Sequence, residues 1–318
     1  MSLDAESVVE RRQLRRRVGK WRILAIAALL FAVFVIFGRM SGSGVFGKTE
    51  QIARIEISGL ITEDHRQLKM LDEIAEADHV TAVLLRVNSP GGTTTGGEAL
   101  YEAIRKISKK KPVVAVFGTV AASAAYIVGI ASDHIVSRGN SITGSVGVIF
   151  QWAEVHDALA KLGVRMNEVK SGDLKASPSM FRPLDENSKA LVDEMVAESH
   201  RWFIDLVKER RKVSESDVPG LVNGRIYSGR EALRLKLVDE IGGEAEAVAW
   251  LESKRSIKSD LPVEQWKIDR MDSFGLLGRM ARWTGWSDFS LERILEQEPL
   301  LQRLRLDGLV SVWQFPKK

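Results

Sequence analysis

Ser123 is the residue whose sequence surroundings most favour nucleophilic chemistry. It follows a β-branched run that begins at Val113 and lies among the small, helix-forming residues 121–131. A hydroxyl at such a junction lies at a helix N-terminus, where unpaired amides and the positive end of the helix dipole stabilise developing negative charge. The position also suits a serine that only caps the helix or packs in a tight corner, so this stretch leaves both interpretations open.

A glycine-rich segment could supply the matching oxyanion site. Residues 88–92 read NSPGG and directly follow an apolar run that ends at Val87. The sequence predicts a tight turn over 90–92, in which Gly91 and Gly92 adopt backbone conformations closed to other residues and direct their amides at one point. Such amides stabilise a tetrahedral oxyanion, although the same sequence also makes an ordinary loop turn.

A serine nucleophile needs a base, and none of the five histidines has a sequence neighbourhood that favours catalysis. A lysine can replace histidine if desolvation lowers a lysine pKa from about 10.4 to near 7. Lys175 lies between two apolar residues in the loop predicted over 171–183, whereas most other lysines lie in charged surroundings. Lys175 is therefore the candidate base, and a solvated surface lysine is the alternative.

The chain around these residues alternates between predicted strands and helices. Strands are predicted at 51–57, 79–87, 112–117, 134–137, 146–150 and 164–169, and helices at 66–77, 97–109, 121–131, 153–162, 186–211, 230–236 and 244–251. Nearly continuous apolar runs such as 79–87 are typical of parallel strands covered on both faces. This order predicts an α/β fold with a largely parallel sheet.

Charge and composition exclude some functions. Residues 1–22 hold seven Lys and Arg against three acids, and beyond them basic and acidic residues balance. No basic domain is therefore present to bind nucleic acid. The chain has no cysteine, which excludes a disulfide framework and a thiol nucleophile.

The N-terminal region predicts a membrane anchor. Residues 23–38 carry no charge, and the uncharged stretch after Arg39 extends the predicted transmembrane segment to 23–40. The basic tail, residues 1–22, predicts a cytoplasmic N-terminus and an exported remainder. A cleaved signal peptide is the alternative, but no A-x-A site follows the apolar core.

Two further segments flank the predicted α/β body. Residues 41–50 have the composition of a flexible linker. Residues 255–318 form a C-terminal extension with four of the eight tryptophans. In it, 274–289 could be an amphipathic helix that packs on the body, on a second copy or on a membrane surface.

Four collinear segments resemble the signal peptide peptidase A family, membrane-bound serine proteases with a Ser–Lys dyad. They are NSPGG after a strand, Ser123 followed by small residues and a tyrosine, ITGSVGVIF at 142–150, and Lys175 in G-x-x-K upstream of F-R-P. The segment 224–243 is also similar to a family segment, with Lys236 where glycine is usual. The resemblance covers about residues 50–253.

The resemblance implies a role for each candidate residue. Ser123 is the expected nucleophile and Lys175 the general base, Ser145 is expected to orient the lysine, and the amides of Gly91 and Gly92 are expected to hold the oxyanion. The family usually has two glycines after the nucleophile, where this chain has Ala124 and Ala125. We expect the activity to survive this difference. The substrate preference at the part of the site that Ala124 and Ala125 would line stays open.

The resemblance also implies the fold and the function. A protease domain over 51–254 is expected to have the ClpP/crotonase-like fold of repeated strand–strand–helix units. The expected protein is the short form, a membrane-anchored serine endopeptidase that cleaves remnant signal peptides or similar hydrophobic peptides. It would lie in the bacterial inner membrane as a single-pass protein with its catalytic domain outside the cytoplasm.

The family's quaternary structure bears on the site, because its lysine reaches the serine across a subunit boundary. A homo-oligomeric ring with shared active sites is therefore expected, and no metal or cofactor is implied. The sequence leaves two alternatives open, a crotonase-like enzyme that transforms acyl groups and a membrane scaffold without catalysis.

Overall fold

The computed structural model describes residues 20–31, 49–268 and 308–312, and the chain divides into two units, Met1–Thr49 and Glu50–Lys318. In the first unit, residues 20–31 are helical and exposed. Among the described residues, no helix combines the length and the apolar character that a membrane crossing requires. The later part of the predicted anchor 23–40, from residue 32 onward, and the predicted helix 274–289 lie outside the described residues.

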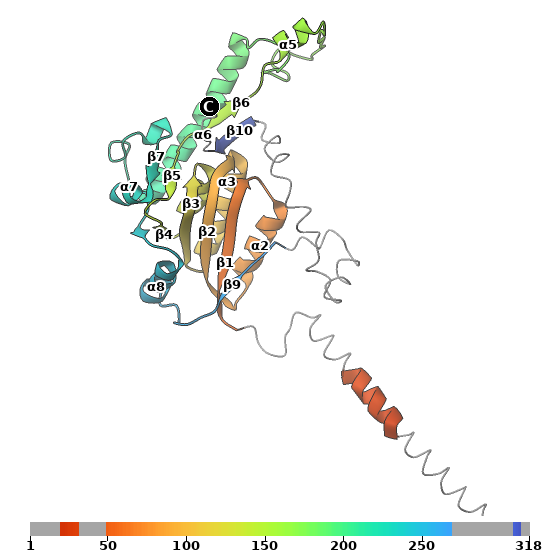
Figure 1. Cartoon of the computed structure of the whole chain (residues 1–318), viewed down its shortest axis with the longest axis vertical. Helices are drawn as coiled ribbons and strands as arrows, with labels where there is room; N and C mark the ends of the chain where they lie inside the picture. Colours follow the sequence, from red (N-terminus) through yellow and green to blue (C-terminus); the bar gives the residue numbers. More distant parts are fainter. Residues whose placement is uncertain (1–19, 32–48, 269–307, 313–318) are drawn as a thin grey trace, which may run out of the picture. The chain divides into compact units, whose positions relative to one another are not determined.

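The second unit is built on a sheet whose central strands are parallel (Figure 1). Its described strands are β1 (Gln51–Ile61), β2 (Val80–Thr93), β3 (Val113–Ala122), β4 (His134–Ser137), β5 (Ile142–Gly144), β6 (Ile149–Gln151), β7 (Ile226–Ser228), β8 (Glu240–Ile241), β9 (Val263–Gln265) and β10 (Gly308–Val312). Parallel pairing gives the order β9–β1–β2–β3–β4–β8, and β5 pairs with the end of β3. Antiparallel pairs join β5 to β7, and β10 to both β2 and β6. The predicted α/β fold with a largely parallel sheet is confirmed.

Helices cover both faces of the central strands, so side chains on both faces are buried. The described helices are α2 (His65–Glu76), α3 (Thr94–Ser108), α4 (Ala124–Ile130), α5 (His156–Lys161), α6 (Glu186–Arg211), α7 (Gly229–Arg234) and α8 (Glu244–Arg255), with a 3₁₀ turn at Leu221–Asn223. Successive strand residues point to opposite faces. Leu85 therefore packs in the cluster with α2, α3 and α4, and Leu84 in the cluster with α8. This two-sided burial explains the nearly continuous apolar run of β2.

The strand that leads to Ser123 is longer than the predicted 112–117. Gly118 and Thr119 do not end it, because the Asn88 side chain of β2 accepts hydrogen bonds from the amides of Thr119 (3.1 Å) and Val120 (3.2 Å). Beyond that point β5 pairs with the last three residues of β3. The following helix is correspondingly shorter, α4 instead of the predicted 121–131. Strand pairing thus holds the backbone up to the residue before Ser123.

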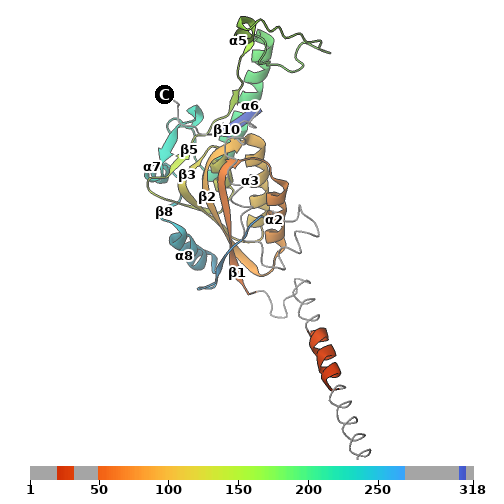
Figure 2. The ribbon, with the colours of Figure 1, turned by 45° about the vertical axis from the view of Figure 1, so that its right-hand side comes forward.

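An arm extends from the sheet and carries β6, α5, the loop to α6 and the first part of α6 (Figures 1 and 2). The predicted strand over 164–169 is wrong, because these residues form neither strand nor helix and are exposed. The predicted strand over 146–150 is found only in its last two residues, as the start of β6, and residues 145–148 between β5 and β6 are not in a strand. The long helix predicted over 186–211 is confirmed as α6, and the loop predicted over 171–183 contains no regular helix or strand.

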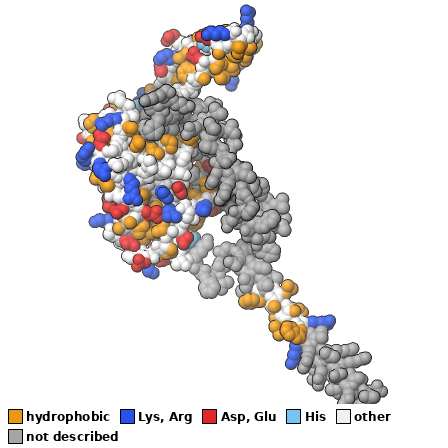
Figure 3. Space-filling model, viewed as in Figure 1, with side chains coloured by type: hydrophobic (Ala, Val, Ile, Leu, Met, Phe, Trp, Pro, Cys, Tyr) orange, Lys and Arg blue, Asp and Glu red, His pale blue; other side chains and the backbone are white. Residues whose placement is uncertain are grey.

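Hydrophobic side chains gather at the outer end of the arm (Figure 3). Those with high exposure are Leu162, Val164, Met166, Val169 and Leu174. Exposed apolar side chains that cluster on one element are typical of a protein contact surface.

Candidate active site

Ser123 occupies a sharp turn between β3 and α4. Its backbone angles, φ 60° and ψ −124°, lie in a region that is strained for a residue with a Cβ atom. Its amide donates to the Gly144 carbonyl (2.8 Å), and its own carbonyl accepts from the Tyr126 amide (2.8 Å). The side chain does not cap α4, although the sequence allowed that interpretation. A strained serine at a strand-to-helix turn is the geometry of a nucleophile elbow.

Packing of α4 fixes this turn. Ala124, next to Ser123, is fully buried, and a Cβ atom on Gly97 of α3 would lie 3.2 Å from the Ala124 Cβ. The absence of a side chain at Gly97 therefore makes room for alanine where the family usually has glycine. The Tyr126 hydroxyl donates to the Leu237 carbonyl (2.8 Å), and burial raises the pKa of this phenol. Tyr126 thus stays a neutral donor that ties α4 to the segment after α7.

The NSPGG segment is not the tight turn that the sequence predicts, because β2 continues through it to Thr93. Gly91 has φ 110°, and the pairing with β1 shifts register between Ser58 and Leu60, opposite this point. A Cβ atom on Gly92 would lie 1.8 Å from the Ile61 carbonyl oxygen, so this position requires glycine. The extended path of the segment follows from this close approach of β1.

Ser89, which the sequence analysis did not single out, supports the glycines. Its hydroxyl is buried, donates to the Gly59 carbonyl (2.6 Å) and accepts from the Gly91 amide (3.1 Å). Ser89 also pairs with Ala121, two residues before Ser123, so the glycines lie beside the strand that carries the serine. Because the Gly91 amide donates to Ser89 in this structure, its oxyanion role stays a prediction, as does that of Gly92.

Ser89→Ala is expected to lower the rate of peptide cleavage about 10- to 100-fold, because the variant loses the hydroxyl that holds Gly91. The matched control is Ser132→Ala. Ser132 is also buried, and its hydroxyl bonds two backbone carbonyls, Gly129 (2.7 Å) and His134 (3.0 Å), at the other end of α4. Thermal unfolding and initial rates are measured on both variants. If Ser89→Ala and Ser132→Ala lose the same stability and the same cleavage rate, Ser89 acts only through stability.

Ser145 lies close to Ser123 in the backbone network. It has φ 53°, its amide donates to the Arg225 carbonyl (2.9 Å), and the carbonyl of the preceding Gly144 accepts from the Ser123 amide. One residue therefore links the backbones of the two serines. Both are held at positive φ by bonds to other parts of the chain, which makes their positions well defined.

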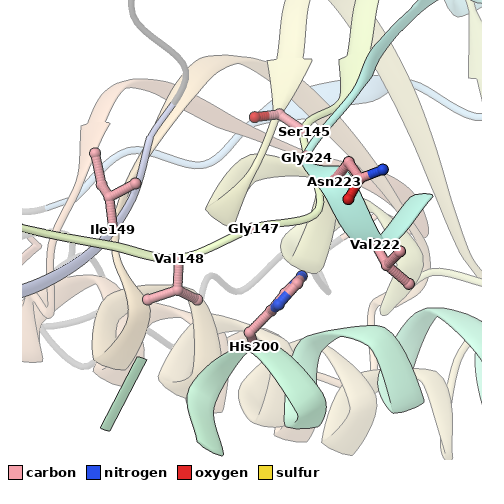
Figure 4. A pocket seen from close by; sticks show the side chains of 8 residues that line it. All are labelled: Ser145, Gly147, Val148, Ile149, His200, Val222, Asn223 and Gly224. Carbon is pink, nitrogen blue, oxygen red and sulfur yellow. The ribbon is translucent and has the colours of Figure 1, made fainter. Parts of the chain in front are cut away.

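A pocket of about 380 Å³ opens beside Ser145 (Figure 4). Its lining residues are Ser145, Gly147, Val148, Ile149, His200, Val222, Asn223 and Gly224. His200 points into it from α6, and its Nε2 atom is buried without a hydrogen-bond partner among the described residues. The sequence around His200 gives no sign of a catalytic role, but helical spacing puts it on the stripe with Phe203 and Val207.

Lys175 lies on the arm, in the loop between α5 and α6. Its side chain is exposed, and its amide donates to the Gly172 carbonyl (3.1 Å). Both ribbon views show the arm extending away from the sheet (Figures 1 and 2). The single chain therefore places Ser123 and Ser145 directly after the paired strands β3 and β5, with the two glycines on the neighbouring β2, whereas Lys175 lies on the arm.

Comparison with known proteins gives two family matches. The chain matches the profile of peptidase family S49 over residues 105–258 and that of Clp protease over residues 50–138. The second match spans β1 to β4 and confirms a ClpP-like α/β fold. Among solved structures, ClpP1 of Listeria monocytogenes is 17% identical with a TM-score of 0.40, over 61% of this chain and 94% of that one.

Curated relatives are similar over most of the body. A Methanocaldococcus jannaschii protein provisionally named a protease is 33% identical over 251 residues, which cover 79% of this chain and 77% of that protein. An Enterococcus faecium protein provisionally named a signal peptide peptidase is 30% identical, over 77% of this chain and 76% of the relative. Protease 4 of Haemophilus influenzae is 30% identical over 63% of this chain and 33% of its own length.

Proposed function

The chain belongs to peptidase family S49 and is a serine protease, and from this premise we propose that Ser123 is its nucleophile and Lys175 its general base. Ser123 Oγ attacks the scissile carbonyl, and Lys175 Nζ takes the hydroxyl proton and passes it to the leaving amine. The amides of Gly91 and Gly92 hold the oxyanion. The observation that carries this proposal is the strained, buried turn at Ser123, next to both the glycines and Ser145.

Lys175 reaches Ser123 from a second copy of the chain in this proposal. The arm that carries Lys175 points away from its own sheet and exposes apolar side chains at its outer end (Figures 1 and 3). Docking of that end on a neighbour would bury the apolar surface and bring the amine to the pocket beside Ser145. There the Ser145 hydroxyl can orient the amine. Repetition of one such contact closes a homo-oligomeric ring.

The proposed substrates are hydrophobic peptides, such as remnants of cleaved signal peptides. The family membership supports this class, as does the name of the Enterococcus faecium relative. We further propose that residues 23–40 anchor the protein in the bacterial inner membrane, with residues 1–22 in the cytoplasm and the protease unit outside it. The uncharged run after a basic tail supports this topology. Such an anchor would keep the protease close to peptides released within the membrane.

A fluorophosphonate probe tests the proposed enzyme against a membrane scaffold without catalysis. The probe bonds covalently to an activated serine, so the assembled full chain in detergent is expected to be labelled, with the adduct mapped to Ser123 by mass spectrometry. The heat-unfolded chain is the control and should not react. A folded assembly that takes up no label would favour the scaffold, and an adduct at a different serine would refute the assigned nucleophile.

A further inference from the structure

His200 is a polar side chain whose inner ring nitrogen has no partner in the described part of the chain. Its Nε2 atom is buried and makes no hydrogen bond to any described residue. The ring rises from α6 into the pocket beside Ser145, which lies on the facing wall (Figure 4). A buried nitrogen without a hydrogen bond costs free energy, so native proteins normally supply a partner. His200 is therefore placed to bind a group that enters the pocket from outside.

The pocket is large enough to hold a side chain. Its volume is about 380 Å³, whereas one water molecule occupies about 30 Å³. Val148, Ile149 and Val222 give it apolar walls, which suit the methylene groups of a long side chain. Ser145 and His200 add polar groups that can bind the tip of such a side chain. This combination fits a lysine, whose apolar stem ends in an amine.

The charge of the lining residues fits an amine that acts as a base. Among the described residues that line the pocket, none is acidic and none is a lysine or an arginine. A carboxylate would pair with an amine and hold it as an ammonium ion, which cannot accept a proton. A hydroxyl and a neutral imidazole instead accept hydrogen bonds without adding a charge. The lining can therefore hold an amine and leave its lone pair for the serine.

We propose that Nε2 of His200 accepts a hydrogen bond from Nζ of Lys175 of a second copy, which makes His200 a positioning residue for the base. A free amine has two N–H donors and one lone pair. Ser145 and His200 accept from the two donors, so the lone pair is directed toward the Ser123 hydroxyl. After Nζ takes the proton of that hydroxyl, the same two acceptors stabilise the ammonium ion. This inference rests on the proposed function, since it names a further partner of the same base.

Two substitutions of His200 separate this role from a packing role. His200→Leu keeps apolar bulk but removes the acceptor, so kcat for peptide cleavage should fall about 10- to 100-fold at an unchanged KM. His200→Gln offers a carbonyl oxygen as acceptor and should restore most of kcat. Ser199→Leu is the matched control, because Ser199 is half-buried on α6 and does not line the pocket. Its kcat and KM should equal those of the wild type.

The rates are compared at matched assembly size, measured by light scattering. Full kcat in His200→Leu, or equal losses in His200→Leu and His200→Gln, would overturn the positioning role. A higher KM at an unchanged kcat would also overturn it and would make the pocket a binding site for a substrate side chain. In a Lys175→Met chain, His200→Leu should cause no further loss of the residual rate, because His200 acts through Lys175. A further loss would contradict the inference.

Cross-linking tests the contact between copies without reference to activity. The chain has no cysteine, so a single cysteine can be placed at each position. Chains with Lys175→Cys and chains with His200→Cys are mixed, allowed to exchange subunits and treated with a short bis-maleimide, which should link them. Lys175→Cys with Lys109→Cys is the control pair and should not be linked. Lys109 caps α3 shortly before β3 begins, whereas Ser123 directly follows the end of that strand.

The combined results distinguish the failure of this inference from the failure of the proposed function. A link together with full activity of His200→Leu would refute only the role of His200. An absent link would overturn the inference. An absent link together with an active Lys175→Met chain would also refute the proposed function.

Discussion

Ser123→Gly is expected to abolish peptide cleavage and to make the protein more stable. Loss of the hydroxyl removes the nucleophile, and the cleavage rate should fall at least about 10,000-fold. The backbone angles at Ser123, φ 60° and ψ −124°, impose a strain of about 1–3 kcal/mol on a residue with a Cβ atom. Glycine adopts these angles without that strain. After the greater chain entropy of unfolded glycine is subtracted, the free energy of unfolding should rise by about 1 kcal/mol.

Lys212→Gly is the matched control for this prediction. Lys212 also has positive φ (56°), but it ends α6 and lies outside the proposed catalytic group. Its replacement by glycine should stabilise the protein by a similar amount and leave cleavage unchanged. Denaturant unfolding and initial rates are measured on both variants. A Ser123→Gly protein that loses stability would contradict the interpretation of the turn as strained, and one that still cleaves would remove Ser123 from the mechanism.

Lys175→Met is the second variant for which we expect a large effect. Methionine keeps most of the length and apolar bulk of the side chain but cannot accept a proton. The rate should therefore fall about 1,000- to 10,000-fold with little change in assembly. Lys161→Met, at the end of α5 on the same arm, is the control, since Lys161 is also exposed. Rates are compared at matched assembly size, measured by light scattering. Full activity of Lys175→Met would refute its role as base.

The fold could be predicted from the sequence where the pattern of buried side chains along a single strand or helix determines the type of that element. The short, nearly continuous apolar run 79–87 favours a strand covered on both faces, the stripe of 186–211 has the helical period, and both elements are found. Predictions failed where a distant partner decides the outcome. The Asn88 side chain extends β3 past Gly118 because it accepts hydrogen bonds from the amides of Thr119 and Val120. The residues 164–169 are exposed and form no strand, despite their alternating pattern.

The candidate site was predictable in part for the same reason. Ser123 directly follows β3 and the glycines lie on the adjoining β2, so their positions follow from the order of the elements. The partner of Ser89 is a carbonyl of β1, and the pocket joins Ser145 to His200 from α6. Such pairings leave no local signal in the sequence. The same would hold for the proposed contact of Lys175 with a second copy, because the periodicity of one chain carries no signal of a contact between copies.

Mixed assemblies of Ser123→Ala and Lys175→Met chains test the central proposal most directly. Each variant alone should be inactive. If every site combines Ser123 of one copy with Lys175 of another, randomly mixed assemblies of equal amounts should regain about a quarter of the wild-type activity. The measurement is the cleavage rate after subunit exchange, with exchange verified by tagged chains. Fully exchanged assemblies that remain inactive would contradict the proposal that the site is shared between copies.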